Sequence, residues 1–251
     1  MKKVIITALL IVLLMGCQST AGDKKTSLRI SAASSLTSVL KEIAVNFEEK
    51  TDYDLIMNFN SSGKLARQIE KGAPGDVYLS ASEKWMDYAL EKGLVTSKSV
   101  RTVLDNRLVL AVPPEGEKSL DLSDLASSHV TKFAIGDPAS VPAGKYAKEA
   151  LKQKGLWKEV QSKAVYAKNV RQVAAYVESG NVDAGLVYRS DVAALDGLQT
   201  AILIREELHS PIHYFGAVIA SSDQKEAARE FLTYMKSEQV KEIYEQYGFD
   251  G

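Results

Sequence analysis

The sequence has little cysteine, no basic excess and no long apolar run beyond its N-terminus. Cys17 is the one cysteine among 251 residues, so no disulfide can form within the chain. Lys and Arg total 31 against 32 for Asp and Glu, which leaves no basic excess of the kind that binds nucleic acid. With 45% apolar and 25% charged residues, the composition is typical of a globular chain rather than a disordered one.

The motifs of several enzyme classes are also missing. The sequence has no HExxH metal motif, no Gly-rich phosphate loop and no G-x-S-x-G nucleophile elbow. His209 and His213 have a spacing that could pair them on a metal if they lay on a helix, but Pro211 between them disfavours a helix. We therefore expect no catalytic residues, no resident metal and no cofactor, and a protein that is not an enzyme.

The N-terminal residues have the features of an export signal. Two lysines precede an apolar run over residues 4–15, which is too short to cross a bilayer because a spanning helix takes about 20 residues. The segment LMGC at residues 14–17 resembles a bacterial lipobox, in which the cysteine is acylated; the alternative is ordinary secretory cleavage beside an incidental cysteine. We expect a signal peptide with lipidated Cys17 over residues 1–17 and a polar tether over residues 18–26.

The rest of the chain alternates between strand-like and helical patterns. Residues 36–49, for example, repeat apolar side chains at helical spacing on one face. The expected strands are residues 28–32, 54–59, 76–80, 107–112, 132–135, 164–166, 184–188 and 213–220. The expected helices are residues 36–49, 64–71, 83–92, 143–154, 170–178, 224–236 and 238–247. This alternation predicts the α/β class, with mainly parallel sheets flanked by helices.

Two β/α units followed by a return strand predict two lobes joined by crossing segments near Asn106 and Ser210. The first lobe would comprise residues 27–106 and 211–251, and the second would comprise residues 107–210. Ligands of open α/β sheets bind outside the carboxyl ends of the strands. We therefore expect the ligand in the cleft between the lobes.

Four loops between a strand and a helix carry small or hydroxyl residues. They are SS at 34–35, SSG at 61–63, VPAG at 141–144 and NVR at 169–171. Helix N-termini present unpaired N–H groups and a partial positive charge, which together bind anions. Each loop alone has an ordinary explanation, because Ser and Asn commonly cap helices and Pro suits the first turn. Four such loops over both expected lobes favour an anion site.

These segments resemble, in order, those of periplasmic molybdate-binding proteins. The matching stretches are SAASSLT (31–37), NSSGKLARQI (60–69), GAPGDV (72–77), GDP (136–138), VPAGKYA (141–147), NVRQ (169–172), DAGLVY (183–188) and YGF (247–249). The resemblance covers nearly all of the mature chain. It implies the type II periplasmic-binding-protein fold and the lipoprotein form of the binding protein of an ABC-type molybdate uptake system.

The resemblance also implies five ligand contacts. Ser35 and Ser62 would each supply a hydroxyl and a backbone N–H from the first lobe. Ala143 and Val170 would supply backbone N–H groups from the second lobe, and Tyr188 its phenol. Molybdenum would enter only as the bound oxyanion, with no direct protein ligand.

A pocket made wholly of hydrogen-bond donors suits molybdate, a dianion without a proton near neutral pH. Phosphate and arsenate often carry a proton, which such a pocket leaves poorly paired. Sulfate is also a tetrahedral dianion without a proton, so only the size of the pocket could distinguish it from molybdate. Tungstate is nearly isosteric with molybdate. Lys145 departs from the family pattern, where we expect an apolar residue, and we expect its side chain to face solvent.

The function that the resemblance implies is capture of molybdate, and of tungstate, outside the cytoplasm for an ABC importer. The partners would be the oxyanion, the transporter permease and, through the lipid on Cys17, the membrane. We expect a monomer that binds no nucleic acid. Two alternatives stay open: the same fold binding sulfate or another anion, and a purely structural surface lipoprotein.

Overall fold

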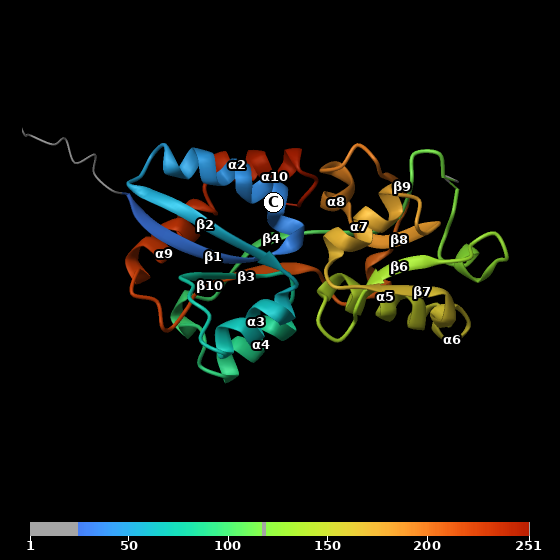
Figure 1. Cartoon of the computed structure of the whole chain (residues 1–251), viewed down its shortest axis with the longest axis horizontal. Coiled ribbons are helices and arrows are strands. Elements are labelled where there is room, and N and C mark those ends of the chain that lie inside the picture. The colour runs from blue at the N-terminus through green and yellow to red at the C-terminus, as the bar shows by residue number, and fades with distance from the viewer. Residues whose placement is uncertain (1–24, 117–118, 251) are drawn as a thin grey trace, which may run out of the picture.

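The computed structural model of the protein describes residues 25–116 and 119–250. The expected signal peptide with Cys17, and the expected tether up to residue 24, lie outside the described residues. The described chain forms two lobes that lie side by side, each built on one five-stranded sheet (Figure 1). Within the two described ranges, no helix is long and apolar enough to cross a membrane.

The first lobe is built on a sheet with the strand order β2-β1-β3-β10-β4. The strands are β1 (Thr26–Ala33), β2 (Tyr53–Asn60), β3 (Val77–Ser80), β4 (Arg101–Asp105) and β10 (His213–Val218). The helices are α2 (Thr37–Glu48), α3 (Ser62–Glu70), α4 (Glu83–Glu91), α9 (Lys225–Tyr234) and α10 (Glu238–Gln246). Helices α2 and α10 cover one face of the sheet, and α3 and α4 cover the other (Figure 1).

The second lobe is built on a sheet with the strand order β7-β6-β8-β5-β9. The strands are β5 (Leu108–Val112), β6 (Phe133–Gly136), β7 (Ala164–Ala167), β8 (Ala184–Tyr188) and β9 (Gln199–Leu203). The helices are α5 (Pro142–Gln153), α6 (Trp157–Val160), α7 (Val170–Glu178) and α8 (Arg189–Ala193). Helices α7 and α8 lie on one side of this sheet, and α5 and α6 lie on the other (Figure 1).

Each sheet has four strands running in one direction and one reversed strand. Strand β1 is parallel to β2 and β3, whereas β10 is antiparallel to both β3 and β4. Likewise β6 is parallel to β7 and β8, whereas β5 is antiparallel to both β8 and β9. The reversed strands are the first ones that the chain forms after crossing from one sheet to the other. The predicted fold class, α/β with mainly parallel sheets, is confirmed.

Two strands and two helices of the structure were not predicted from the sequence. Strands β4 and β9 are edge strands, and β9 leaves Ile202 and Leu203 exposed, so neither shows the apolar run or clean alternation that marks a buried strand. Helices α6 and α8 have four and five residues, fewer than the two turns over which a helical period becomes visible.

The apolar core holds the strand ends in place around the boundary between the lobes. One continuous cluster of buried apolar residues extends through both lobes, and all five residues of β5 belong to it. A second cluster lies around α3 and α4, with Tyr78 and Trp85 as its largest side chains. Strands buried on both faces are continuously apolar, which is why β5 was recognisable in the sequence.

Candidate functional site

A cavity lies between the two lobes, where the carboxyl ends of β1, β2 and β8 face one another. About 190 Å³ of space at this site is free of protein atoms, and part of that space is open to solvent. Its lining residues are Ala33, Ser34, Ser35, Ser61, Ser62 and Ala81 from the first lobe and Val141, Pro142, Ala143, Val170 and Tyr188 from the second. All five residues that the sequence predicted as ligand contacts, Ser35, Ser62, Ala143, Val170 and Tyr188, are among them. The lining contains no charged side chain.

Four helical N-termini reach this cavity, as the loop pattern predicted. Ser35 lies in a short 3-10 turn that leads into α2, and Ser62 is the first residue of α3. Ala143 lies in the first turn of α5, and Val170 is the first residue of α7. None of these first turns contains an acidic residue. Because first-turn N–H groups have no partner within their own helix, the cavity receives several free donors and four positive dipole ends.

Two buried hydroxyls at the cavity have no hydrogen-bond partner among the described residues, those of Ser61 and Tyr188. Both side chains are almost wholly inaccessible to solvent. Burial, followed by interactions with Tyr214 and other neighbours, raises the pKa of Tyr188 well above its ordinary value, so its phenol keeps its proton. An unpaired buried hydroxyl costs about 1–3 kcal/mol. These two groups are therefore suited to a ligand that accepts hydrogen bonds.

Ser61 was not among the predicted contacts. It precedes α3 at the N-cap position, yet its hydroxyl makes no capping hydrogen bond. At the corresponding position of α7, Asn169 does cap the helix, accepting a hydrogen bond from the N–H of Gln172 at 2.9 Å. The sequence signal at the two sites is the same, a polar residue before a helix, so pattern alone could not separate a cap from a free donor.

The hydroxyls of Ser35 and Ser62 are each already bonded on the protein side. Ser62 Oγ accepts a hydrogen bond from the backbone N–H of Ala81 at 3.0 Å. Ser35 Oγ lies 2.7 Å from the phenol oxygen of Tyr214, a residue of β10 that the sequence analysis did not single out. Both serines are buried. An oxygen that accepts one hydrogen bond keeps its own hydrogen for a second partner.

Close approaches that only glycine permits bring the helix ends to the cavity. A Cβ atom on Gly144, in the first turn of α5, would lie 1.8 Å from the carbonyl oxygen of Gly136 at the end of β6. A Cβ atom on Gly63, in the first turn of α3, would lie 2.5 Å from the Trp85 ring and 2.8 Å from the Ser140 carbonyl oxygen. The glycines of the VPAG and SSG motifs thus have a packing reason as well as a predicted ligand role.

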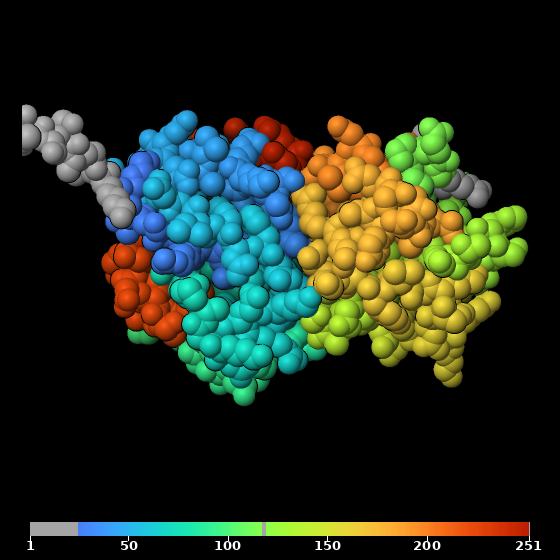
Figure 2. All heavy atoms as spheres, in the orientation of Figure 1, coloured from blue at the N-terminus to red at the C-terminus, as the bar shows by residue number. Residues whose placement is uncertain are grey.

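The lobes are hydrogen-bonded to each other around the cavity. The N–H of Gly63 donates to the carbonyl of Ser140 at 3.2 Å, and the guanidinium of Arg171 in α7 donates to Ser38 Oγ in α2 at 2.7 Å. The surfaces of the two lobes meet along a seam on the face shown in Figure 2. The two lobes are therefore in direct contact beside the cavity.

Near the chain crossings, an ion-pair cluster also joins the lobes. The carboxylate of Asp250 accepts hydrogen bonds from Arg107 at 2.9 Å and from Arg189 at 2.6 Å. Burial raises the pKa of Asp250, but the hydrogen bonds from the two arginines outweigh it and hold the pKa below its ordinary value. The C-terminal residues of the first lobe are thereby tied to the start of β5 and of α8.

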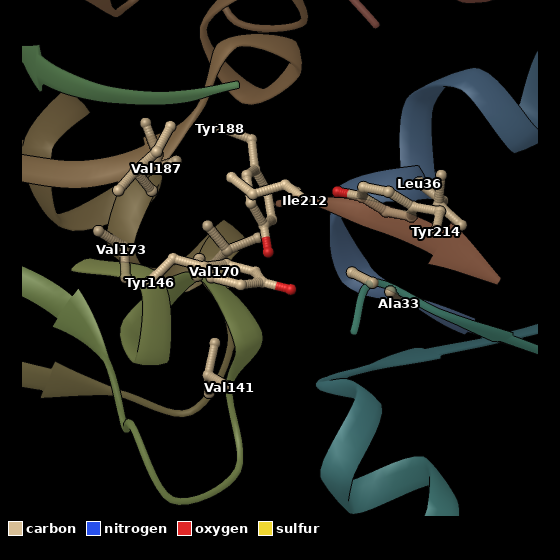
Figure 3. Packing of buried hydrophobic residues seen from close by; sticks show 14 of the residues in the cluster. Ala33, Leu36, Val141, Tyr146, Val170, Val173, Val187, Tyr188, Ile212 and Tyr214 are labelled. Carbon is tan, nitrogen blue, oxygen red and sulfur yellow. The ribbon is translucent and has the colours of Figure 1, made fainter. Parts of the chain in front are cut away.

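Three phenols point toward the lobe boundary, those of Tyr146 and Tyr188 from the second lobe and that of Tyr214 from the first (Figure 3). Burial raises the pKa of Tyr146 to about 12, although a hydrogen bond with Ser82 acts in the opposite direction. All three phenols therefore stay protonated near neutral pH. They can act as donors at the boundary.

A charged pair lies beside the cavity, and the sequence analysis did not predict it. Arg171 Nε lies 3.5 Å from the carboxylate of Asp191, which is fully buried and also accepts the N–H of Tyr188 at 3.2 Å. Burial raises the pKa of Asp191 to about 6, and the charge of Arg171 opposes this rise. The ionised pair adds no net charge to the surroundings of the ligand.

The remaining polar residues singled out in the sequence lie outside the cavity. Lys145 forms an ion pair with Glu149 at 3.4 Å and does not line the cavity, so the expectation that it faces away is confirmed. His213 is hydrogen-bonded to Asp105 at 2.6 Å. Over residues 25–116 and 119–250, no group of three His, Cys, Asp or Glu side chains is placed to hold a metal ion.

Known proteins share both the sequence and this architecture. Residues 28–250 match the family described as bacterial extracellular solute-binding protein. YvgL of Bacillus subtilis (strain 168), provisionally named an ABC transporter substrate-binding lipoprotein, is 39% identical over 250 residues, which cover 97% of this chain and 95% of YvgL. The molybdate-binding protein ModA of Escherichia coli (strain K12) is 37% identical over 226 residues, which cover 88% of this chain and 87% of ModA.

A solved structure agrees with these relatives. The substrate binding domain of a provisionally named molybdenum ABC transporter from Clostridium difficile is 37% identical and has a TM-score of 0.69, covering 90% of this chain and 98% of that one. The family match spans both lobes and all the lining residues of the cavity. The chain belongs to the bacterial extracellular solute-binding protein family, and its relatives within that family include molybdate-binding proteins.

Proposed function

We propose that this protein captures molybdate, and also tungstate, outside the cytoplasm and delivers it to the permease of an ABC importer. The observation that carries the proposal is the interlobe cavity itself. Its polar lining consists of hydroxyls and backbone N–H groups, two of the hydroxyls have no protein partner, and no charged side chain lines it. The similarity to molybdate-binding proteins supports the same ligand.

The hydrogen-bond donors at the cavity suit a dianion without a proton, and their summed free energies are compatible with tight binding. Ser35, Ser61, Ser62 and Tyr188 offer hydroxyls, and the helix N-termini offer backbone N–H groups. Hydrogen bonds to a charged group contribute roughly 1.5–3 kcal/mol each. Seven or so of them, less the ordering cost, are compatible with about 8–12 kcal/mol, the range of micromolar to nanomolar affinity. None of these groups forms the nucleophile–base pair that a hydrolytic enzyme needs, so we propose binding without catalysis.

The clamp works by closure about the two crossing segments. We place the first lobe at residues 27–106 and 211–251 and the second at residues 107–210. Each lobe supplies part of the donor set, so the closed form gains from the anion only when the anion bridges both lobes. The permease would then recognise the closed shape. X-ray scattering in solution tests this step, because saturating molybdate should make the profile more compact, and an unchanged profile would contradict closure.

Lipidation of Cys17 would keep the protein at the membrane as a monomer. The lipobox-like segment and the provisional naming of YvgL as a lipoprotein support this anchor. Replacing Cys17 with serine should move the protein from the membrane fraction to the soluble fraction. Retention of the variant in the membrane fraction would contradict the proposal that a lipid on Cys17 anchors the protein.

Calorimetric titration tests the ligand. The chain starting at residue 18 is titrated in turn with molybdate, tungstate, sulfate and phosphate. We expect tight one-to-one binding of the first two and weak binding of the last two. Tight binding of sulfate with no heat from molybdate would support an anion-binding protein whose ligand is sulfate. No binding of any anion would favour a structural lipoprotein.

A further inference from the structure

Arg171 bridges the two lobes beside the interlobe cavity. It follows Val170 in the first turn of α7, so its backbone belongs to the second lobe. Its Nη2 donates a hydrogen bond to Oγ of Ser38, in α2 of the first lobe, at 2.7 Å. Its Nε lies 3.5 Å from Oδ1 of Asp191, in α8 of the second lobe. One guanidinium therefore has a partner in each lobe.

The segments that meet at Arg171 also carry predicted ligand contacts. Ser38 lies in the first turn of α2, directly after the 3-10 turn that contains Ser35. Asp191 accepts a hydrogen bond from the backbone N–H of Tyr188 at 3.2 Å. The side chain of Arg171 thus connects, through the protein alone, segments that the anion would connect inside the cavity.

The ion pair with Asp191 keeps the guanidinium at the lobe boundary. Asp191 is fully buried and Arg171 is largely buried, so solvent screens their attraction only weakly. Arg171 Nε and Asp191 Oδ1 nevertheless have no hydrogen-bond partner among the described residues. Charge alone holds this pair together, whereas the shorter contact of the guanidinium is its hydrogen bond to the first lobe.

Other contacts between the lobes differ from this one in place or in kind. The ion pairs of Asp250 lie near the chain crossings, where opening of the lobes about those crossings changes distances least. The hydrogen bond between Gly63 and Ser140 joins backbone atoms. The bond from Arg171 to Ser38 lies beside the cavity and has a charged donor, and such bonds are about twice as strong as neutral ones.

We propose that Arg171 is a positioning residue that slows release of the bound anion by holding α2 of the first lobe against α7 of the second. The inference rests on the proposed anion-binding function and on closure of the lobes around the ligand. The bond to Ser38 exists only while the lobes are in contact, so it stabilises the closed state relative to the open one. It lowers the rate of dissociation and leaves the rate of association unchanged, because the anion enters while the lobes are apart.

The test is the Ser38→Ala variant of the full-length chain in detergent. Calorimetry gives the affinity for molybdate, and a chase of bound radiolabelled molybdate with excess unlabelled molybdate gives the dissociation rate. We expect the dissociation rate to rise by about three- to tenfold and the affinity to fall by the same factor. The effect is smaller than the loss of a fully buried charged hydrogen bond, because the freed guanidinium can move toward Oδ1 of Asp191.

Two further variants separate bridging from packing. Thr233→Ala removes a hydroxyl that accepts from Arg101 at 3.5 Å within the first lobe, and should change neither rate. Arg171→Lys keeps a positive charge near Asp191, but one ammonium nitrogen cannot take the places of both Nε and Nη2. It should therefore match Ser38→Ala, and the combined variant should lose no more than either alone.

Several outcomes overturn the inference. An unchanged dissociation rate in Ser38→Ala would show that this bond does not hold the lobes together. Slower association in place of faster dissociation would show that Ser38 acts before the lobes meet. Additive losses in the combined variant would show that Arg171 and Ser38 act independently. A wild type that does not bind molybdate would overturn the proposed function as well, whereas a wild type that binds it, with unchanged release in Ser38→Ala, overturns this inference alone.

Discussion

The two lobes have the same sheet topology but bring different donors to the cavity. In the strand orders β2-β1-β3-β10-β4 and β7-β6-β8-β5-β9, each position of one sheet has a counterpart of the same direction in the other. The first lobe lines the cavity with serine hydroxyls from Ser34, Ser35, Ser61 and Ser62. The second lobe lines it with apolar residues at the N-termini of α5 and α7 and with one phenol, that of Tyr188.

This difference separates two kinds of recognition. A backbone N–H at a helix N-terminus donates whatever the side chain, so the helix ends of the second lobe favour a negatively charged ligand. A hydroxyl can donate or accept, so the serines of the first lobe, like Tyr188 of the second, can pair with either kind of group on a ligand. One sheet topology used twice thus supplies mainly serine hydroxyls from one lobe and mainly helix N-termini from the other.

The largest expected effect is loss of the serine hydroxyls from the first lobe. Replacing both Ser35 and Ser62 with alanine removes two hydrogen bonds to a charged ligand, about 3–6 kcal/mol in total, or roughly a 10²–10⁴-fold weaker affinity for molybdate. Calorimetry measures the loss. Ser99→Ala is the matched control, because Ser99 is buried in the same lobe and bonds to Thr96 and Val218 instead of lining the cavity. Affinity within about threefold of wild type in the double variant would show that the serine hydroxyls of the first lobe do not bind the anion.

A smaller loss is expected from removing one backbone donor of the second lobe. Val170→Pro deletes the first N–H of α7, where proline is well tolerated and where the preceding Asn169 is already extended. Molybdate should bind about 10–100-fold more weakly, the equivalent of one hydrogen bond to a charged group. Val170→Ala keeps the N–H and should stay near wild type. If the two variants bind alike, the second lobe does not recognise the anion through its backbone.

Tyr188→Phe should affect binding and stability in opposite directions. The phenol has no protein partner, so its loss removes an unpaired buried group and should leave the anion-free protein as stable as wild type or more stable by about 1 kcal/mol. The same change removes a donor to the ligand, and the affinity should fall by about 10–100-fold. Thermal unfolding with and without molybdate measures both effects. A destabilised anion-free variant would indicate that the phenol has a structural partner.

The smallest expected effect concerns the ionisation of Asp191 in the second lobe. Its folded pKa of about 6 lies above the ordinary value of 3.8, so the folded state holds the proton more tightly than the unfolded chain. The stability due to this group is complete below about pH 4 and is lost as the pH rises through about 6. Unfolding temperatures of the wild type minus those of Asp191→Asn should therefore fall between pH 4 and 7. A constant difference would show that Asp191 keeps its ordinary pKa.

Local patterns in the sequence were enough for the interior of both sheets and for the positions where the helices begin. Buried strands such as β5 and β8 are uninterrupted apolar runs, and α2 and α7 repeat at helical spacing. The edge strands β4 and β9 were missed, because an edge strand is half solvated and its pattern depends on the neighbours it meets. The five predicted contacts came from ordered motifs, and the structure brings them into one cavity.

The sequence by itself determined the fold class, the family and the loops that line the cavity, because these depend on periodicity and on short motifs within a few residues of each other. Tertiary structure decided how the donors are oriented. Ser35 and Tyr214 are 179 positions apart, and Asn106 and Tyr214 are 108 apart, so no local pattern could show that they form one hydrogen-bond chain. The direction of a hydroxyl is set by whichever group reaches it in space, and only the packed lobes bring those groups together.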